Sequence, residues 1–213
     1  MKIYFSPLAC SLASKITVYE AGAETDVDFV EVDPKTKKTL PAGDDYLAVS
    51  RLGLVPALVR DDGALLTENG AILQALARRF TGAKLAPESD DARARLQMYL
   101  SFVGSELHKL LAMLLDEHAP PTVKEYATTK VGKRLSWIDG ELEGKAYLLG
   151  TFSVADAYLF TVLNWTLVLP VKLDAYANVT AFMTRMRARP AVARAFDEER
   201  KLYVEELARH GKA

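Results

Sequence analysis

The chain has 213 residues, of which 50% are hydrophobic and 26% are charged, and its 27 basic and 28 acidic residues leave a net charge of -1. This composition is typical of a globular protein and excludes the disordered, fibrous and membrane-spanning classes. The charge balance provides no general attraction to nucleic acid or to an anionic membrane surface. The most apolar stretch, 158–171, is too short and too polar to span a bilayer.

The N-terminus and the cysteine content bear on the compartment. The first ten residues carry one lysine but no sustained apolar segment, so we expect no signal peptide and a cytoplasmic location. Cys10 is the single cysteine of the chain, which excludes an internal disulfide and suits a reducing compartment.

The chain begins with a pattern typical of a strand, a helix and a second strand. A short apolar run over 2–5 ends at Ser6-Pro7, and helical spacing follows over 11–21 until Gly22. Residues 27–32 then alternate strictly between apolar and polar side chains, which predicts the second strand. The two strands should therefore run parallel with a right-handed crossover.

A hairpin and a helix are expected next. Apolar runs over 57–60 and 65–67 flank Asp61-Asp62-Gly63, and Asp-Gly between apolar runs is the strongest short-range hairpin signal. Residues 68–80 show helical spacing. The order of these elements is thioredoxin-like.

Residues 82–91 are a predicted linker. Beyond it the hydrophobic spacing is helical along nearly the whole chain and predicts helices at roughly 91–116, 121–142, 154–169, 178–188 and 191–208. Ser153 and Asp156 fit a capping box at the start of the third of these helices. The predicted fold class is therefore α/β plus all-α: an N-terminal thioredoxin-like domain over 1–81, followed by a C-terminal helical bundle domain over 92–213.

Cys10 is the first candidate for chemistry. It lies after the first strand, at the N-terminal edge of the first helix, where the helix dipole favours a thiolate and lowers the thiol pKa. A buried structural cysteine is the alternative interpretation. No second cysteine follows in a C-x-x-C motif, so a redox partner thiol would have to come from outside the chain.

Three short segments of the first domain have open interpretations. Val55-Pro56 precedes the third strand, and the residues alone favour a proline that simply marks the start of that strand. Glu68-Asn69 starts a helix, where free N–H groups either hold a carboxylate or are simply capped. The lysines at 35, 37 and 38 form a solvated loop or pair with a ligand carboxylate.

On the helix over 91–116, Ser101, Ser105 and His108 cluster on a face separate from the leucine stripe. A solvated face with a lone histidine is the default interpretation. Met98 and Phe102 lie on that side too, which suggests a second packing surface such as a dimer contact. No metal-ligand spacing, phosphate-binding glycine loop or nucleophile elbow is present.

Together these segments resemble the cytosolic-type glutathione S-transferases, and most closely their bacterial beta class. The resemblance covers essentially the whole chain and is carried by the lysine segment from Asp33 to Thr39 and by the motifs SPLACSLAS, GDDYLAV, LVPAL, LTENGAI, SELHK and FSVADAYLFTVL. It implies a glutathione-binding N-terminal domain, a helical C-terminal domain, a homodimer, and glutathione as co-substrate with no metal.

The resemblance also implies roles for individual residues. Cys10 would lie beside the glutathione sulfur, where it could form a mixed disulfide, Ser11 could donate to the thiolate, and His108 would be the third polar group there. The implied glutathione-binding residues are Cys10, Lys37 (for the glycyl carboxylate), Val55 (through its backbone), Pro56 (as a cis-proline), Glu68 and Asn69 (for the γ-glutamyl end), Ser101, Ser105 and His108.

Four positions depart from the family pattern. Leu8, Asn69, Ser101 and Asn164 stand where relatives carry Gly, Gly, Asn and Arg. The function implied is conjugation of glutathione to small apolar electrophiles, accompanied by mixed-disulfide chemistry at Cys10. A glutathione-dependent thiol–disulfide oxidoreductase or peroxidase, and a non-enzymatic ligand-binding module of the same fold, are the alternatives.

Overall fold

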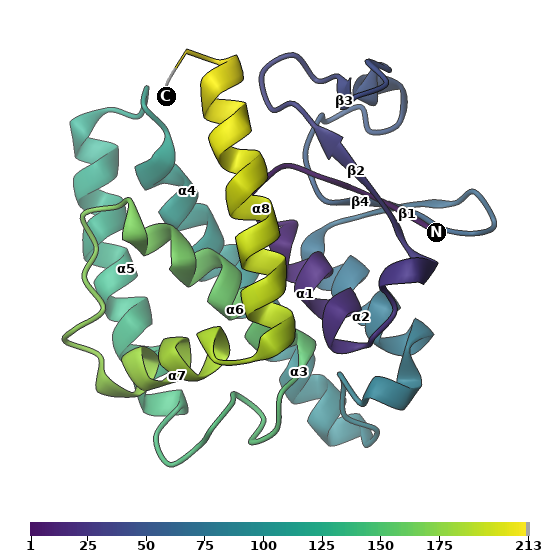
Figure 1. Cartoon of the computed structure of the whole chain (residues 1–213). Coiled ribbons are helices and arrows are strands. Elements are labelled where there is room, and N and C mark those ends of the chain that lie inside the picture. The colour runs from purple at the N-terminus through teal and green to yellow at the C-terminus, as the bar shows by residue number, and fades with distance from the viewer. Residues whose placement is uncertain (212–213) are drawn as a thin grey trace. The chain divides into compact units, whose positions relative to one another are not determined.

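A five-stranded mixed sheet with the order β3-β2-β1-β4-β5 forms the centre of the N-terminal part of the protein. The computed structural model describes residues 1–211 (Figure 1). The strands are β1 (Lys2–Phe5), β2 (Asp28–Val32), β3 (Thr39–Leu40), β4 (Ala57–Val59) and β5 (Leu65–Thr67). β1 and β2 are parallel, whereas β4 and β5 form an antiparallel hairpin. Both pairings confirm the sequence prediction, which did not include the two-residue strand β3.

The chain packs as two compact units. The first contains Met1–Lys84 together with the chain from Pro190 onward, and the second contains Leu85–Arg189. The first unit carries α1 (Leu12–Glu20), α2 (Asn69–Arg79) and α8 (Pro190–Arg209). The predicted linker over 82–91 contains the boundary between the two units, which lies between Lys84 and Leu85.

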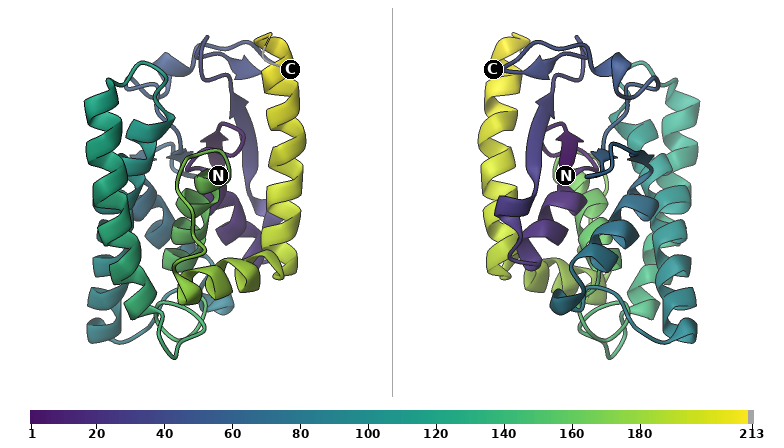
Figure 2. Two further views of the ribbon diagram at one scale, coloured as in Figure 1. Left: turned by 90° about the vertical axis from the view of Figure 1, so that its left-hand side faces the viewer. Right: turned by 90° about the vertical axis from the view of Figure 1, so that its right-hand side faces the viewer.

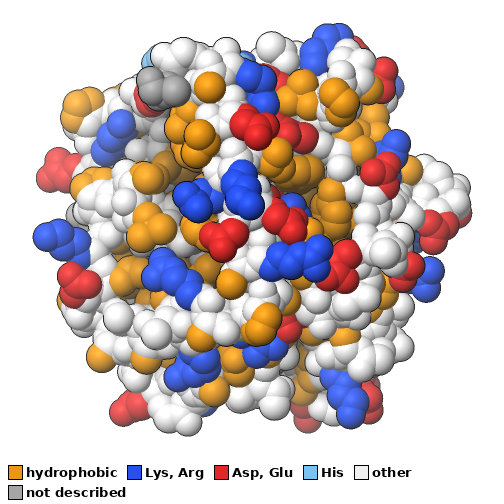
Figure 3. Space-filling model, viewed as in Figure 1, with side chains coloured by type: hydrophobic (Ala, Val, Ile, Leu, Met, Phe, Trp, Pro, Cys, Tyr) orange, Lys and Arg blue, Asp and Glu red, His pale blue; other side chains and the backbone are white. Residues whose placement is uncertain are grey.

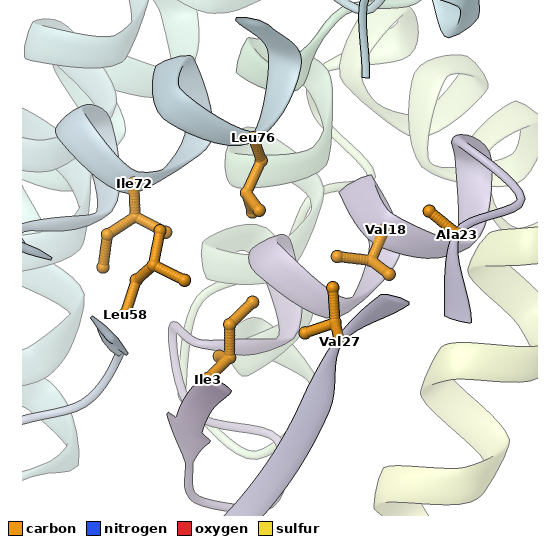
Figure 4. Close-up of a cluster of buried hydrophobic side chains, with 7 residues drawn as sticks. All are labelled: Ile3, Val18, Ala23, Val27, Leu58, Ile72 and Leu76. Carbon is orange, nitrogen blue, oxygen red and sulfur yellow. The ribbon is translucent and has the colours of Figure 1, made fainter. Parts of the chain in front are cut away.

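The core of the first unit follows from the alternation of side chains along the strands. Ile3 on β1 lies in a cluster with side chains from α1 and α2, and Figure 4 shows these side chains pointing toward one another. The whole cluster is Ile3, Val18, Ala23, Val27, Leu58, Ile72 and Leu76. Tyr4, the next residue of β1, belongs instead to a cluster with Val32, Tyr46 and Ala57, because successive side chains point to opposite faces of a sheet.

α8 packs against α1, and the views of Figures 1 and 2 agree that the two helices run side by side. The sequence grouped this helix with the other C-terminal helices. Its contacts are instead with the first unit: Glu198 accepts from Tyr19 Oη at 2.6 Å, and Arg194 pairs with Glu24 at 2.8 Å. Side chains of both charges gather along the outer surface of α8 (Figure 3).

The second unit is helical. Its helices are α3 (Asp90–Phe102), a π-helical segment (Val103–His108), α4 (Lys109–Leu115), α5 (Pro121–Glu141), α6 (Val154–Asn164) and α7 (Ala177–Arg187). Every residue of α6 is buried, so this helix is the core of the unit. The continuous helix predicted over 91–116 contains the π-helical segment in its middle, and the helix predicted over 154–169 ends at Asn164.

The predicted capping box is present at the start of α6. Asp156 Oδ2 accepts from the backbone N–H and the hydroxyl of Ser153, each at 2.8 Å, and its Oδ1 accepts from Leu148 N–H at 2.9 Å. Within residues 1–211, no helix combines the length and the apolarity needed to cross a bilayer.

Candidate functional site

Cys10 lies in the turn that joins β1 to α1, and it contacts the loop before β4. Its Sγ donates to the carbonyl oxygen of Val55 at 3.1 Å. Burial is the largest influence on the thiol and raises its pKa to about 12, and the carboxylates of Glu68 and Glu199 act in the same direction. Cys10 is therefore a protonated donor in this geometry. The expected thiolate is not favoured, because desolvation outweighs the effect of the helix N-terminus.

Ser11, the next residue, is fully buried and closes the same turn. Its hydroxyl donates to the carbonyl oxygen of Ser6 at 3.2 Å and accepts from the Ser6 N–H at 3.3 Å. A hydroxyl has one proton to donate. In this geometry Ser11 therefore stabilises the turn, and donation to a thiolate remains a prediction.

The loop before β4 has the conformation that the family resemblance implied. The Val55–Pro56 peptide bond is cis, as is Leu40–Pro41, which the sequence did not predict. The carbonyl of Val55 is the group that accepts from Cys10.

The start of α2 joins the same cluster through Asn69. The buried Asn69 side chain donates from Nδ2 to the carbonyl oxygen of Cys10 at 2.8 Å. Its Oδ1 is a buried acceptor without a hydrogen-bond partner in the protein. A ligand ammonium or N–H group would satisfy this oxygen.

The backbone is unusual at three positions around this cluster. Leu8, Lys37 and Glu68 have φ of 55°, 56° and 68°, and among residues 1–211 only one further non-glycine residue, Lys84, has a positive φ. Such conformations are unfavourable for residues with a Cβ, and they tend to gather at functional sites. The family glycine at position 8 now has a physical explanation, since glycine adopts positive φ without penalty.

Lys37 lies on a loop that is anchored at Asp33. Asp33 Oδ1 accepts from the backbone N–H groups of Lys35 and Thr36 at 2.9 and 2.8 Å. Although burial opposes it, these bonds hold the pKa of Asp33 below its usual value. Lys37 Nζ reaches the carbonyl oxygen of Gly53 at 3.0 Å, so its ammonium is already positioned by the backbone.

The sequence did not predict Glu199, which holds the Cys10 turn from α8. This fully buried residue accepts from Leu8 N–H at 2.8 Å. Burial raises its pKa to about 8, and the nearby Lys15 ammonium opposes that rise. Only packing of α8 on α1 brings these residues together, so no local signal in the sequence could have identified Glu199.

In the second unit, the π-helical segment carries His108 toward α6. His108 Nδ1 lies 2.6 Å from Tyr158 Oη, and its ring makes edge contacts with Tyr158 and Trp165. Burial, followed by the Lys109 charge, lowers the pKa of His108 to about 4. The default interpretation of a lone solvated histidine is therefore wrong. The sequence did not assign Tyr158 and Trp165 to the site.

Ser101 and Ser105 are exposed, and their hydroxyls form hydrogen bonds with residues four positions away in the sequence. Ser101 Oγ accepts from Gln97 at 3.1 Å, and Ser105 Oγ donates to the Ser101 carbonyl oxygen at 2.9 Å. Met98 is 43% exposed, whereas Phe102 packs on Trp137 with ring centroids 4.2 Å apart. Their roles in ligand binding and in a dimer contact remain predictions.

Comparisons with known proteins identify the family to which the chain belongs. The family model "Glutathione S-transferase, N-terminal domain" matches residues 9–79, and "Glutathione S-transferase, C-terminal domain" matches residues 69–190. The chain is 40% identical over 201 residues to glutathione S-transferase GstA of Escherichia coli O157:H7, covering 93% of this chain and 98% of the relative.

Two solved structures are similar over nearly their whole length. A sphingomonad glutathione S-transferase complexed with glutathione has a TM-score of 0.88 and 41% identity, over 93% of this chain and 98% of that one. The bacterial beta-class glutathione S-transferase of Sphingomonas chungbukensis has a TM-score of 0.87 and 42% identity, with the same coverage. The chain described here belongs to the glutathione S-transferase family.

Proposed function

We propose that the protein conjugates glutathione to small, largely apolar electrophiles. The observation that carries this proposal is the meeting of three separate segments: Cys10 bonds Val55 through Sγ, and Asn69 bonds the Cys10 carbonyl. The family resemblance assigns Cys10 to the glutathione sulfur, the backbone of Val55 to the tripeptide and Asn69 to the γ-glutamyl end. The glutathione complex of the similar sphingomonad enzyme supports the same ligand.

Each part of the tripeptide has a matching group in the first unit. The N-terminus of α2, Glu68 and the orphaned Asn69 Oδ1 suit the charged γ-glutamyl end. The backbone of Val55, before the cis-proline Pro56, would pair with the cysteinyl residue. The ammonium of Lys37 suits the glycyl carboxylate.

The catalytic requirement is a glutathione thiolate at neutral pH. The protonated Cys10 donates to the Val55 carbonyl oxygen here, and rotation of this S–H toward a bound glutathione thiolate would stabilise the thiolate charge. Ser11 holds the turn that positions Cys10. His108 is proposed as the second donor to the sulfur, and Ser101 and Ser105 as further ligand-binding residues on the same helix.

The raised pKa of Cys10 favours conjugation over the redox alternative. Attack on a disulfide requires a thiolate, and at neutral pH a thiol with a pKa near 12 is almost wholly protonated. Mixed-disulfide formation at Cys10 would therefore be slow unless the bound ligand changes this environment. A homodimer is also part of the proposal. So is a cytoplasmic location, because a single cysteine suits a reducing compartment.

Glutathione-dependent turnover of a generic aryl halide tests the proposal, with wild type, Cys10→Ala and Cys10→Ser compared. We expect turnover in the wild type and a decrease of about tenfold to a hundredfold in Cys10→Ala, since a hydrogen bond to a charged group contributes about 1.5–3 kcal/mol. Cys10→Ser keeps a donor and should retain most of the activity.

The other outcomes decide between the alternatives. Loss of turnover in folded Cys10→Ser as well would show that the reaction requires the sulfur of Cys10. A wild type that is retained on immobilised glutathione but conjugates nothing would favour the oxidoreductase. A wild type that conjugates nothing and is not retained on immobilised glutathione would favour the binding module.

A further inference from the structure

His108 belongs to the only π-helical segment among residues 1–211, between α3 and α4. Isolated π-helical turns within α-helices are rare, and they frequently occur at functional sites. The segment adds a residue to the helical turn and so changes the direction in which the following side chains point. His108 is partly buried as a result, and its ring contacts side chains of α6 and of the turn after it.

The contact between His108 and Tyr158 is short. Nδ1 and Oη are 2.6 Å apart, and Tyr158 is 3% exposed. N–H···O bonds span about 2.7–3.2 Å, so 2.6 Å is short for donation from Nδ1–H to the tyrosine oxygen, and hydroxyl donors make the shorter bonds, about 2.5–3.0 Å to oxygen. The distance therefore favours donation from the tyrosine hydroxyl to Nδ1 over donation in the reverse direction.

The environment of His108 requires a neutral ring. Burial lowers the pKa of His108 to about 4, so that at neutral pH the imidazole carries one proton. A neutral imidazole donates from one nitrogen and accepts at the other, and the bond made at one nitrogen determines which. If Nδ1 accepts from Tyr158, the proton is on Nε2.

We propose that Tyr158 is a positioning residue that holds His108 as the Nε2–H tautomer, so that Nε2 is the hydrogen-bond donor toward the glutathione thiolate. This inference rests on the proposed function, in which His108 acts at the sulfur. Trp165 contributes to the same end, because its ring lies at 67° to the imidazole with centroids 5.0 Å apart and restricts rotation of that ring.

Nitrogen NMR of protein labelled with ¹⁵N-histidine tests the tautomer directly. The chain has three histidines, and the signals that disappear in His108→Asn identify those of His108. We expect the Nε2–H pattern in the wild type. An Nδ1–H pattern in the wild type would overturn the proposal, and this arm needs no variant at position 158.

Tyr158→Phe removes the hydroxyl and keeps the ring. We expect the His108 signals to move toward an average of the two tautomers in this variant. Tyr99→Phe is the matched control, because Tyr99 is an equally buried tyrosine of the same unit and its hydroxyl bonds Glu141 instead. The control should leave the His108 signals unchanged. An unchanged Nε2–H pattern in folded Tyr158→Phe would show that Tyr158 does not select the tautomer.

Kinetics separate positioning from general stability. We expect Tyr158→Phe to lower kcat by about threefold to tenfold, with KM for glutathione within about twofold, as the loss of one hydrogen bond predicts. In a His108→Gln background, Tyr158→Phe should have no further effect on kcat. An equal decrease in both backgrounds would contradict action through His108. A wild type without conjugating activity would instead refute the proposed function, while the NMR result would still decide the hydrogen-bond direction.

Discussion

Glu199 accepts a hydrogen bond from the backbone N–H of Leu8 at 2.8 Å, although 191 residues separate them in the sequence. A buried carboxyl group on α8 thus holds the turn that carries Cys10. Burial is the main influence on the pKa of this carboxyl group and raises it, so the group is largely protonated at neutral pH.

Glu199 should make the stability of the protein depend on pH. Its pKa rises from an ordinary 4.5 to about 8 in the folded protein, so between these values the folded state binds more protons than the unfolded state. The free energy of unfolding should therefore fall as pH rises from 4.5 to 8. Glu199→Gln resembles the protonated acid and should lose this slope, as urea denaturation at pH 5, 6, 7 and 8 would measure.

Glu198 is a neighbouring control with the opposite sign. Although burial opposes it, bonds from Tyr19, Arg194 and Lys15 lower its pKa, so its contribution is present above its ordinary pKa and lost in acid. Glu198→Gln should therefore destabilise the protein at neutral pH and keep the Glu199 slope. If Glu199→Gln retained the same slope as the wild type, a different group would be responsible.

The left-handed backbone of Leu8 predicts an unusual order of two variants. Leu8→Ala and Leu8→Gly both remove the apolar side chain, but only glycine also removes the unfavourable contact of Cβ with the backbone at φ of 55°. This contact costs about 1–2 kcal/mol. We expect Leu8→Gly to be more stable than Leu8→Ala by about 1 kcal/mol in thermal or urea denaturation. The usual order, with alanine more stable, would show that the turn has another conformation in solution.

Asn69 should affect glutathione affinity more than the fold. Asn69→Ala removes both the donor to Cys10 and the orphaned acceptor, so we expect KM for glutathione to rise by about tenfold with a smaller change in kcat. Gln74→Ala on the same helix is the control, because that amide donates to Gly70 of its own helix. Similar KM values for the two variants would remove Asn69 from the binding site.

The capping box of α6 should contribute to stability and not to glutathione binding. Asp156 accepts three hydrogen bonds, so Asp156→Ala leaves three donors without a partner and should cost about 2–4 kcal/mol. Ser153→Ala removes one cap contact and should cost about 1 kcal/mol. Unfolding in urea gives both values. Folded Asp156→Ala with altered KM for glutathione would contradict a purely structural role.

Much of this architecture could be predicted from the sequence because it depends on local pattern. Alternating side chains over 27–32 predicted β2, Asp61-Asp62-Gly63 predicted the hairpin, and Ser153 with Asp156 predicted the capping box. Strand pleating, turn conformation and helix capping are decided by residues a few positions apart.

Tertiary structure alone decided the properties that depend on burial and on distant partners. Cys10 was expected to be a thiolate, yet the surrounding chain desolvates it and raises its pKa. His108 was expected on a solvated face, yet the π-helical segment directs it to Tyr158. Packing of α8 on α1 brought Glu199 to Leu8. A sequence specifies which groups can ionise or bond, but desolvation and pairing depend on which distant segments enclose them.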